Sequence, residues 1–400
     1  MKRGMLLSVL LALAVASLRA DAITETNAKA CALVAAHSQA APSRRVLAIV
    51  QVAAFEAVNA IAGRPRTSRL DLSAARDASA AAAVASATRV ALLALIPSAA
   101  TPIEAWYAEA LAQVPDGLGK VEGIALGARA ARGVLALKAG DGASEPETYR
   151  PQTSPGAYVP TVTPAVPHWP GRKPWHMKSA DQFRPGPPPD LASSTWAQDF
   201  NESRALGGKV SAKRTPEQTA IGKFWEDNSS AIYFGVLQRV AEAPGRDLVA
   251  NAWLYACAAT GMDDATIAVM DAKYAYRFWR PLTAIRNGDQ DGNDATEREA
   301  GWSPLIETPM HPEYPCAHCI NGAVLAELLD AALPPGVPVA LATTSLTAPG
   351  VVRTWTSTAA MVEEVGNARI WSGVHYRTST RAGEAMGHEL GRLVVEAWRR

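Results

Sequence analysis

Apolar residues recur every three or four positions over most of this chain, which is the spacing of one face of an α-helix. No stretch alternates convincingly between apolar and polar residues as a half-buried strand does, and no repeat of fixed period is found. The pattern therefore predicts an all-α fold. The predicted helical stretches are residues 24–62, 74–95, 102–111, 121–137, 214–225, 228–240, 247–280, 317–333, 356–369 and 380–400.

Residues 145–192 interrupt this pattern with closely spaced prolines and interleaved tryptophans. A proline-rich segment is often a linker, but the aromatic residues favour an ordered strap that lies across a helical surface. A segment of this length could also line an active site, and a free linker is the third interpretation. The sequence thus predicts an N-terminal helical bundle at 23–144, a Pro/Trp-rich strap at 145–192 and a second, C-terminal bundle at 193–400, packed against the first.

The first 22 residues are typical of a signal peptide. Lys2 and Arg3 precede an apolar run, and Ala20-Asp21-Ala22 provides small residues for cleavage. We therefore expect an exported protein, periplasmic or secreted; a short membrane anchor is the alternative. No other stretch predicts membrane insertion. Cleavage would change the net charge from +1 to about −1, and without a basic tract the sequence gives no support for nucleic-acid binding.

Candidate chemistry begins with Lys273 and Arg280. Their spacing of seven residues is about two helical turns, so we expect both side chains on one face of a helix. Two cations held close together, beside Phe278 and Trp279, are costly unless an anion lies between them. This stretch therefore predicts one wall of an anion pocket in the C-terminal bundle.

Two later segments predict the other walls. Pro315 precedes an apolar helix, so the backbone N–H groups of Cys316, Ala317 and His318 lie at a helix N-terminus, which favours anions. His318 is also placed to exchange protons with a bound group.

Arg369 and His375 lie six residues apart, and Gly373 between them could end a helix and turn His375 back toward Arg369. Cations and imidazoles without neighbouring carboxylates in the sequence indicate a site for a tetrahedral oxyanion.

These three segments resemble the signature of vanadium-dependent haloperoxidases and the type 2 phosphatidic acid phosphatase superfamily. The chain has Lys273, six residues, Arg280-Pro281; then Pro315-Cys316-Ala317-His318; then Ala368-Arg369, five residues, His375. The order and the spacing both match. The helix at 44–59, the strap and residues 214–225 also resemble the soluble bacterial haloperoxidase-like branch.

The resemblance implies a role for each matched residue. His318 would be the acid–base residue. His375 would be the axial ligand to vanadium in a peroxidase, or the nucleophile that attacks phosphorus in a phosphatase. The remaining matched positions would bind the oxygens of vanadate or phosphate: Lys273, Arg280, Arg369, Cys316 and the backbone N–H of Ala317.

Three positions depart from the family pattern. Cys316 replaces a serine and Ala317 a glycine, while Ser379 stands where some members have an aspartate that orients the histidine corresponding to His375. Cations near Cys316 should lower the pKa of its thiol, and a thiolate would repel an oxyanion. Cys316 and Cys319 also form a Cys-x-x-Cys pair, which could be a redox pair, a disulfide, two metal ligands with His311 or His318, or two free thiols.

The leading functional hypothesis is an exported enzyme that oxidises halide with H₂O₂ at a protein-bound vanadate cofactor. An acid phosphatase with a phosphohistidine intermediate at His375, and no cofactor, is the alternative enzyme. A third hypothesis is a non-catalytic protein that binds oxyanions. The expected partners are small molecules: H₂O₂ and halide, or a phosphomonoester.

Overall fold

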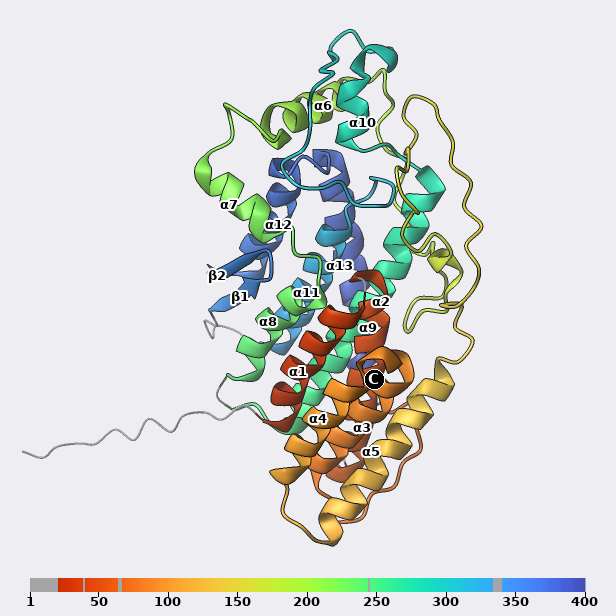
Figure 1. The fold of residues 1–400 in the computed structure, drawn as a ribbon, viewed down its shortest axis with the longest axis vertical. Coiled ribbons are helices and arrows are strands. Elements are labelled where there is room, and N and C mark those ends of the chain that lie inside the picture. Colours follow the sequence, from red (N-terminus) through yellow and green to blue (C-terminus); the bar gives the residue numbers. More distant parts are fainter. Residues whose placement is uncertain (1–20, 39, 64–66, 244, 334–339, 400) are drawn as a thin grey trace, which may run out of the picture.

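The computed structural model describes residues 21–38, 40–63, 67–243, 245–333 and 340–399. The predicted signal peptide lies outside this range except for Asp21 and Ala22. Helices dominate the described residues, with one short hairpin, so the predicted all-α class is confirmed. Figure 1 shows two groups of helices stacked along the long axis, with an irregular segment running beside them.

The N-terminal bundle ends close to the predicted boundary at residue 144, and the turn at 139–144 follows its last helix. Its helices are α1 (Ala22–His37), α2 (Ala40–Ala62), α3 (Ala80–Leu95), the short η1 (Pro97–Ala99), α4 (Ala100–Ala112) and α5 (Leu118–Leu137). Within the described residues, only the stretch Ala41–Ala62 is long and apolar enough to span a membrane. An 18-residue apolar window of this stretch is 78% buried inside the protein.

The strap contains one short helical turn, η2 (Trp169–Gly171), and otherwise has no regular structure. The C-terminal bundle follows it. Its helices are α6 (Ser194–Gly207), α7 (Pro216–Phe224), α8 (Ser230–Ala241), α9 (Leu248–Tyr276), α10 (Pro281–Arg286), η3 (Gly288–Gln290), α11 (Ala317–Ala332), α12 (Thr358–Trp371) and α13 (Arg377–Arg399).

An antiparallel hairpin between α11 and α12 was not predicted. Its strands are β1 (Leu341–Ser345) and β2 (Ala348–Trp355), which pair from Leu341 opposite Trp355 to Ser345 opposite Ala348. The two strands differ in burial: β1 is mostly buried, whereas most of β2 is exposed or half-buried. Because neither strand has one clean apolar face, the sequence carries no clear period of two.

Helix α9 is the centre of the molecule. It is buried around almost its whole circumference from Val249 to Tyr274, as expected for a helix that is apolar on all sides. It packs against α2 of the first bundle and against α11 and α13 of the second (Figure 1). One hydrophobic core therefore continues through both bundles.

The strap is fixed to α9 by buried ionic contacts, which supports the interpretation that it wraps a helical surface. Arg172 donates two hydrogen bonds to Asp263, of 2.7 and 2.9 Å, and a third to Asp141 at the end of the first bundle. Asp264 accepts the backbone N–H groups of Trp175 and His176 at 2.7 and 2.8 Å. These pairs satisfy carboxylates that would otherwise be unpaired inside the protein.

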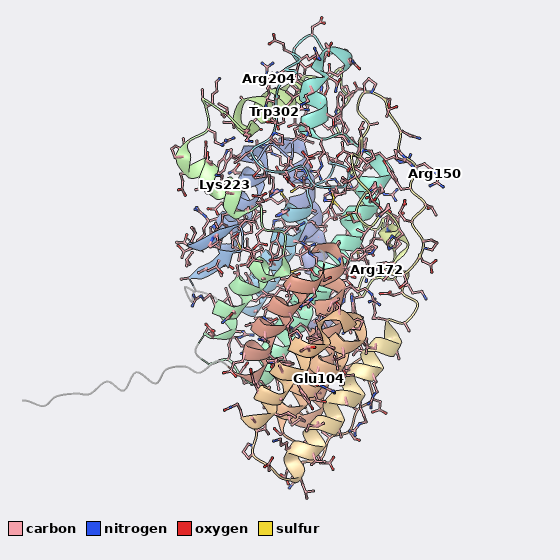
Figure 2. The ribbon with its side chains drawn as sticks, viewed as in Figure 1. Glu104, Arg150, Arg172, Arg204, Lys223 and Trp302 are labelled. Carbon is pink, nitrogen blue, oxygen red and sulfur yellow. The ribbon has the colours of Figure 1, made fainter. Side chains whose placement is uncertain are left out.

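Replacing Arg172 by leucine should lower the free energy of unfolding by about 3–5 kcal/mol, because Asp263 would remain buried without a counterion. Denaturant unfolding followed by circular dichroism measures this loss. Arg150→Leu is the matched control, since Arg150 lies exposed on the same strap (Figure 2). An equal loss in both variants would contradict the role given to Arg172.

Candidate active site

Lys273 and Arg280 do not share a helix face, so this prediction was wrong. Helix α9 ends at Tyr276, and Arg277 adopts a left-handed conformation with φ +51°. Lys273 therefore lies in the last turn of α9, while Arg280 is the residue immediately before α10. The strap supports the intervening residues, because Trp279 N–H donates to Gly156 O and Tyr158 N–H to Arg277 O.

Lys273 holds the loop that leads into α11. Its ammonium group is fully buried and donates to three backbone carbonyls, those of Pro312 (3.0 Å), Glu313 (2.7 Å) and Pro315 (2.5 Å). Burial and the nearby Arg280 guanidinium lower the pKa of Lys273 well below its usual value. The side chain thus supports the anion-binding loop from behind.

Arg280 joins the same loop to the segment after α12. Its Nε donates to His311 O at 3.0 Å, and its Nη1 donates to Val374 O at 2.7 Å. Nη1 also lies 3.2 Å from Nε2 of His375, and Nη2 lies 2.9 Å from Nδ1 of His311. Arg280 and His375 are therefore in direct contact although they are 95 residues apart.

Helix α11 begins as the sequence predicts. Cys316 is its N-cap, and its Sγ accepts a 3.3 Å hydrogen bond from the Cys319 N–H. His318 follows in the first turn, with Nε2 3.3 Å from Asp227 O. Burial, Arg369 and Arg44 lower the pKa of His318 well below its usual value, so its imidazole is neutral.

Helix α12 ends at Trp371, and Gly373 follows with φ +72°. The predicted break at this glycine is confirmed. A side chain would be excluded there, because a Cβ would come within 2.3 Å of Gly207 O. The turn brings Val374 N–H to within 3.3 Å of Arg369 O and places His375 against Arg280.

Glu313 is the residue at this site that the sequence reasoning missed. Its Oε1 lies 2.6 Å from Nδ1 of His375 and accepts the Tyr376 N–H at 3.1 Å. The Ser379 hydroxyl is further from the same Nδ1, at 3.3 Å. Burial raises the pKa of Glu313 to about 8, against the opposing effect of Arg280 and Lys273. The sequence feature that could have identified this residue is the presence of one acidic side chain, Glu313, in the loop from His311 to Cys316.

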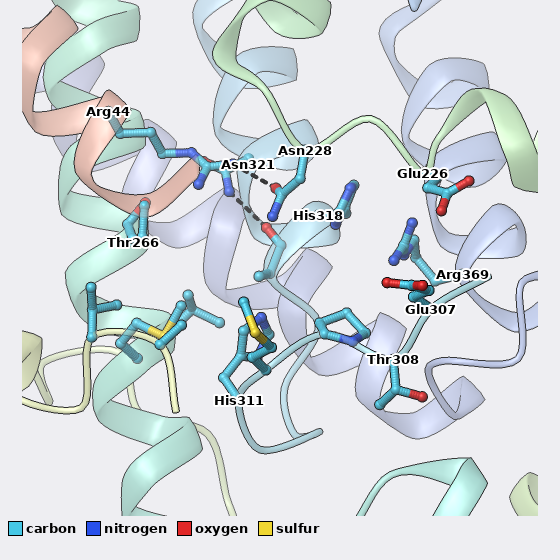
Figure 3. A pocket seen from close by; sticks show the side chains of 18 of the residues that line it. Arg44, Glu226, Asn228, Thr266, Glu307, Thr308, His311, His318, Asn321 and Arg369 are labelled. Atoms are coloured by element: carbon cyan, nitrogen blue, oxygen red, sulfur yellow. Dashed lines mark hydrogen bonds between the residues drawn. The ribbon is translucent and has the colours of Figure 1, made fainter. Parts of the chain in front are cut away.

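A cavity of about 460 Å³ opens over this site (Figure 3). Among the predicted residues, Ala317, His318 and Arg369 line it, whereas Lys273, Arg280, Cys316 and His375 lie behind its wall. The strap contributes Ala165 and Val166, so it lines the cavity as well as wrapping α9. Sequence reasoning did not place the further polar residues in this lining: Arg44, Glu226, Asn228, Thr266, Glu307, Thr308, His311 and Asn321.

The donors at the site suit a tetrahedral oxyanion. Arg369 is 1% exposed, and its Nε has no hydrogen-bond partner. Nε2 of His375 carries a lone pair, since the Arg280 guanidinium that faces it can only donate. Burial and the surrounding cations, Arg280, Lys273 and Arg369, lower the pKa of His375 well below its usual value. The residues therefore fit vanadate or phosphate, with a neutral imidazole available as a ligand or nucleophile.

The two cysteines at the start of α11 are free thiols, with their Sγ atoms 2.7 Å apart. Among the residues that the structure describes, no group of three or more His, Cys, Asp or Glu side chains could hold a metal ion. The geometry thus gives no support to the interpretation that Cys316 and Cys319 are metal ligands.

Residues 253–400 match the family model described as the VCPO second helical-bundle domain. Over 151 residues, 31% of this chain, the sequence is 30% identical to vanadium chloroperoxidase of Curvularia inaequalis. That match spans 25% of the length of this relative.

Solved structures extend the likeness to the whole fold. The first bacterial vanadium-dependent iodoperoxidase has a TM-score of 0.81 with 21% identity, over 94% of this chain and 95% of that one. A holo-type bacterial vanadium-dependent chloroperoxidase has a TM-score of 0.71 with 15% identity, over 90% and 92%. The chain therefore has the fold of the bacterial vanadium haloperoxidases, and its residues 253–400 match the second helical-bundle domain of that family.

Proposed function

We propose that this protein is a vanadate-dependent haloperoxidase that oxidises halide with H₂O₂. The observation that carries the proposal is the environment of His375: a neutral imidazole, 1% exposed, whose Nε2 lone pair faces a buried arginine. Such a nitrogen suits a ligand to the metal of an oxyanion held by cations. Bound vanadate would supply the centre at which peroxide oxidises halide.

The protein's own residues would hold and orient this group. Arg369, Arg280 and Lys273 provide positive charge, and the N-terminus of α11 provides the Ala317 N–H for oxyanion oxygens. His375 would bind vanadium through Nε2. His318 lines the cavity as a neutral imidazole, so it can take a proton from a peroxide that enters there.

A phosphatase would use the same arrangement. Nε2 of His375 would attack phosphorus. His318 would protonate the leaving alcohol after the negative charge of the bound phosphate has raised its pKa and it has taken up a proton. The observation that keeps this alternative is the neutral His375, which serves equally well as a nucleophile.

One assay separates the two reactions and the non-catalytic hypothesis. Bromide oxidation by H₂O₂ is measured on the purified protein with and without added orthovanadate, alongside hydrolysis of a phosphomonoester. Halide oxidation that requires vanadate supports the proposal. Hydrolysis that vanadate inhibits, without halide oxidation, overturns it in favour of the phosphatase. Oxyanion binding with neither reaction overturns both.

Cys316 should make oxyanion binding sensitive to pH. Burial raises the pKa of its thiol, but the contact with Cys319 and the charges of Arg369 and Lys273 outweigh burial and lower the pKa to about 7. Above this pH the thiolate would repel the anion. At pH 8.5, Cys316→Ser should therefore bind orthovanadate about tenfold more tightly than the natural protein, as expected for two charges a few ångströms apart, and the difference should shrink toward pH 6.

The quantity to measure is the ratio of the orthovanadate dissociation constants of the natural protein and Cys316→Ser. The protonation of vanadate changes both constants equally and therefore cancels in this ratio. Cys31→Ser is the control, since burial raises the pKa of Cys31 to about 12 and this thiol stays neutral. A ratio that does not change between pH 6 and 8.5 would show that Cys316 does not ionise in this range.

A further inference from the structure

We infer that Glu313 is the positioning residue of His375: Oε1 of its carboxyl group accepts the hydrogen bond from Nδ1–H and thereby leaves the lone pair on Nε2, the ring nitrogen that faces Arg280. The inference concerns the protein without any bound group, and its consequence for activity rests on the proposed function.

The contacts around the ring determine its tautomer. Nε2 lies 3.2 Å from Nη1 of Arg280. A guanidinium only donates hydrogen bonds, so Nε2 must be the acceptor, and a neutral ring then carries its proton on Nδ1. The acceptor for that proton is Oε1 of Glu313, at 2.6 Å.

The carboxylate is itself held in place from two sides. Tyr376 N–H donates to the same Oε1, and the backbone carbonyl of Glu313 accepts a hydrogen bond from Lys273. Glu313 is fully buried. One residue thus links the cation at the end of α9 to the histidine before α13. A hydrogen-bond acceptor that holds Nδ1–H fixes the tautomer and the orientation of the ring, which matters for a ligand or nucleophile.

Ser379 offers a direct test of this assignment. Its hydroxyl lies 3.3 Å from Nδ1 of His375, on the first turn of α13, and its side chain is buried. An aspartate at this position would bring a carboxylate to the same nitrogen from a different element. The acidic side chain that contacts Nδ1 can therefore be moved from Glu313, in the loop before α11, to position 379 in the first turn of α13.

The experiment compares Glu313→Ala with the double variant Glu313→Ala/Ser379→Asp. Two quantities are measured: the orthovanadate dissociation constant, and the ¹⁵N chemical shifts of the His375 ring in the apoprotein labelled at its 7 histidines. The His375 signals are identified by their loss in His375→Ala. The natural protein should show a protonated Nδ1 and an unprotonated Nε2.

Glu313→Ala should lose this fixed tautomer and bind orthovanadate about 10–100-fold more weakly, the usual effect of removing a group that orients a metal ligand. The double variant should restore the tautomer and most of the affinity. Glu327→Ala is the matched control, because Glu327 accepts a hydrogen bond from His388 away from the cavity, and its loss should change neither quantity at His375.

A proton on Nε2 in the natural protein would overturn the inference, and so would an unchanged tautomer in Glu313→Ala. Failure of the double variant to recover either quantity would likewise contradict it. Glu313→Gln is the second variant, for the case in which the alanine variant does not fold. Its amide oxygen can accept the hydrogen bond from Nδ1 of His375, so this variant should keep the ring proton on Nδ1. If halide oxidation is absent, the ring shifts still test the inference, so its failure and that of the proposed function are distinguishable.

Discussion

Under the proposed function, replacing His375 by alanine should abolish activity, with a loss of at least about 10⁴-fold in turnover, as expected when a residue that would bond to the reacting centre is removed. The reason is its place in the site. No other described imidazole combines an Nε2 that faces Arg280 with a glutamate side chain on Nδ1. Steady-state halide oxidation with added orthovanadate measures the loss, and phosphomonoester hydrolysis is followed in parallel.

The matched control for this variant is His388→Ala. His388 also pairs with a glutamate, Glu327 at 2.8 Å, but it is half-exposed and lies outside the cavity. The control should keep full activity, and circular dichroism should show that both variants are folded. Full activity in His375→Ala would refute the role taken from the family resemblance.

Replacing His318 by alanine should separate chemistry from binding. His318 lines the cavity and stays neutral because of burial and the charges of Arg369 and Arg44, which suits a residue that accepts a proton from an incoming substrate. Turnover should fall by about 10²–10⁴-fold, the usual contribution of a general acid or base. The affinity for orthovanadate should change by only a few-fold, since His318 Nε2 hydrogen-bonds the backbone carbonyl of Asp227 at 3.3 Å and is not one of the positive charges that would hold the oxyanion.

Orthovanadate titration and steady-state kinetics on the same preparation measure both quantities. His168→Ala is the control, because His168 lies on the strap and does not line the cavity. Equal losses of affinity and turnover in His318→Ala would assign His318 to oxyanion binding instead of proton transfer.

The sequence predicted the members of the site better than their arrangement. The three segments were identifiable because each combines a local signal, such as the glycine after Arg369 or the proline before Cys316, with the family spacing. The shared helix face of Lys273 and Arg280 was wrong because periodicity assumes a continuous helix. The left-handed residue that ends α9 is Arg277, and such a conformation in a residue other than glycine has no clear signature in the sequence.

Glu313 and Arg44 could not be assigned from sequence for a different reason. Glu313 meets His375 across 62 positions, and Arg44 reaches the cavity from the first bundle, where it donates to Asn228 across 184 positions. Contacts of this range depend on how helices pack, which a local pattern does not encode. The strap shows the same limit, since it contacts α9 through Arg172 and lines the cavity through Ala165 and Val166.

The contact of Arg172 with carboxylates of both bundles has a consequence for how the protein loses its structure. Asp141 follows the last helix of the first bundle, and Asp263 belongs to the central helix of the second. Because the hydrophobic core is also continuous across this boundary, unfolding of one bundle would expose apolar and charged groups of the other. We therefore expect the two bundles to unfold in one cooperative transition despite the two-part appearance of the molecule.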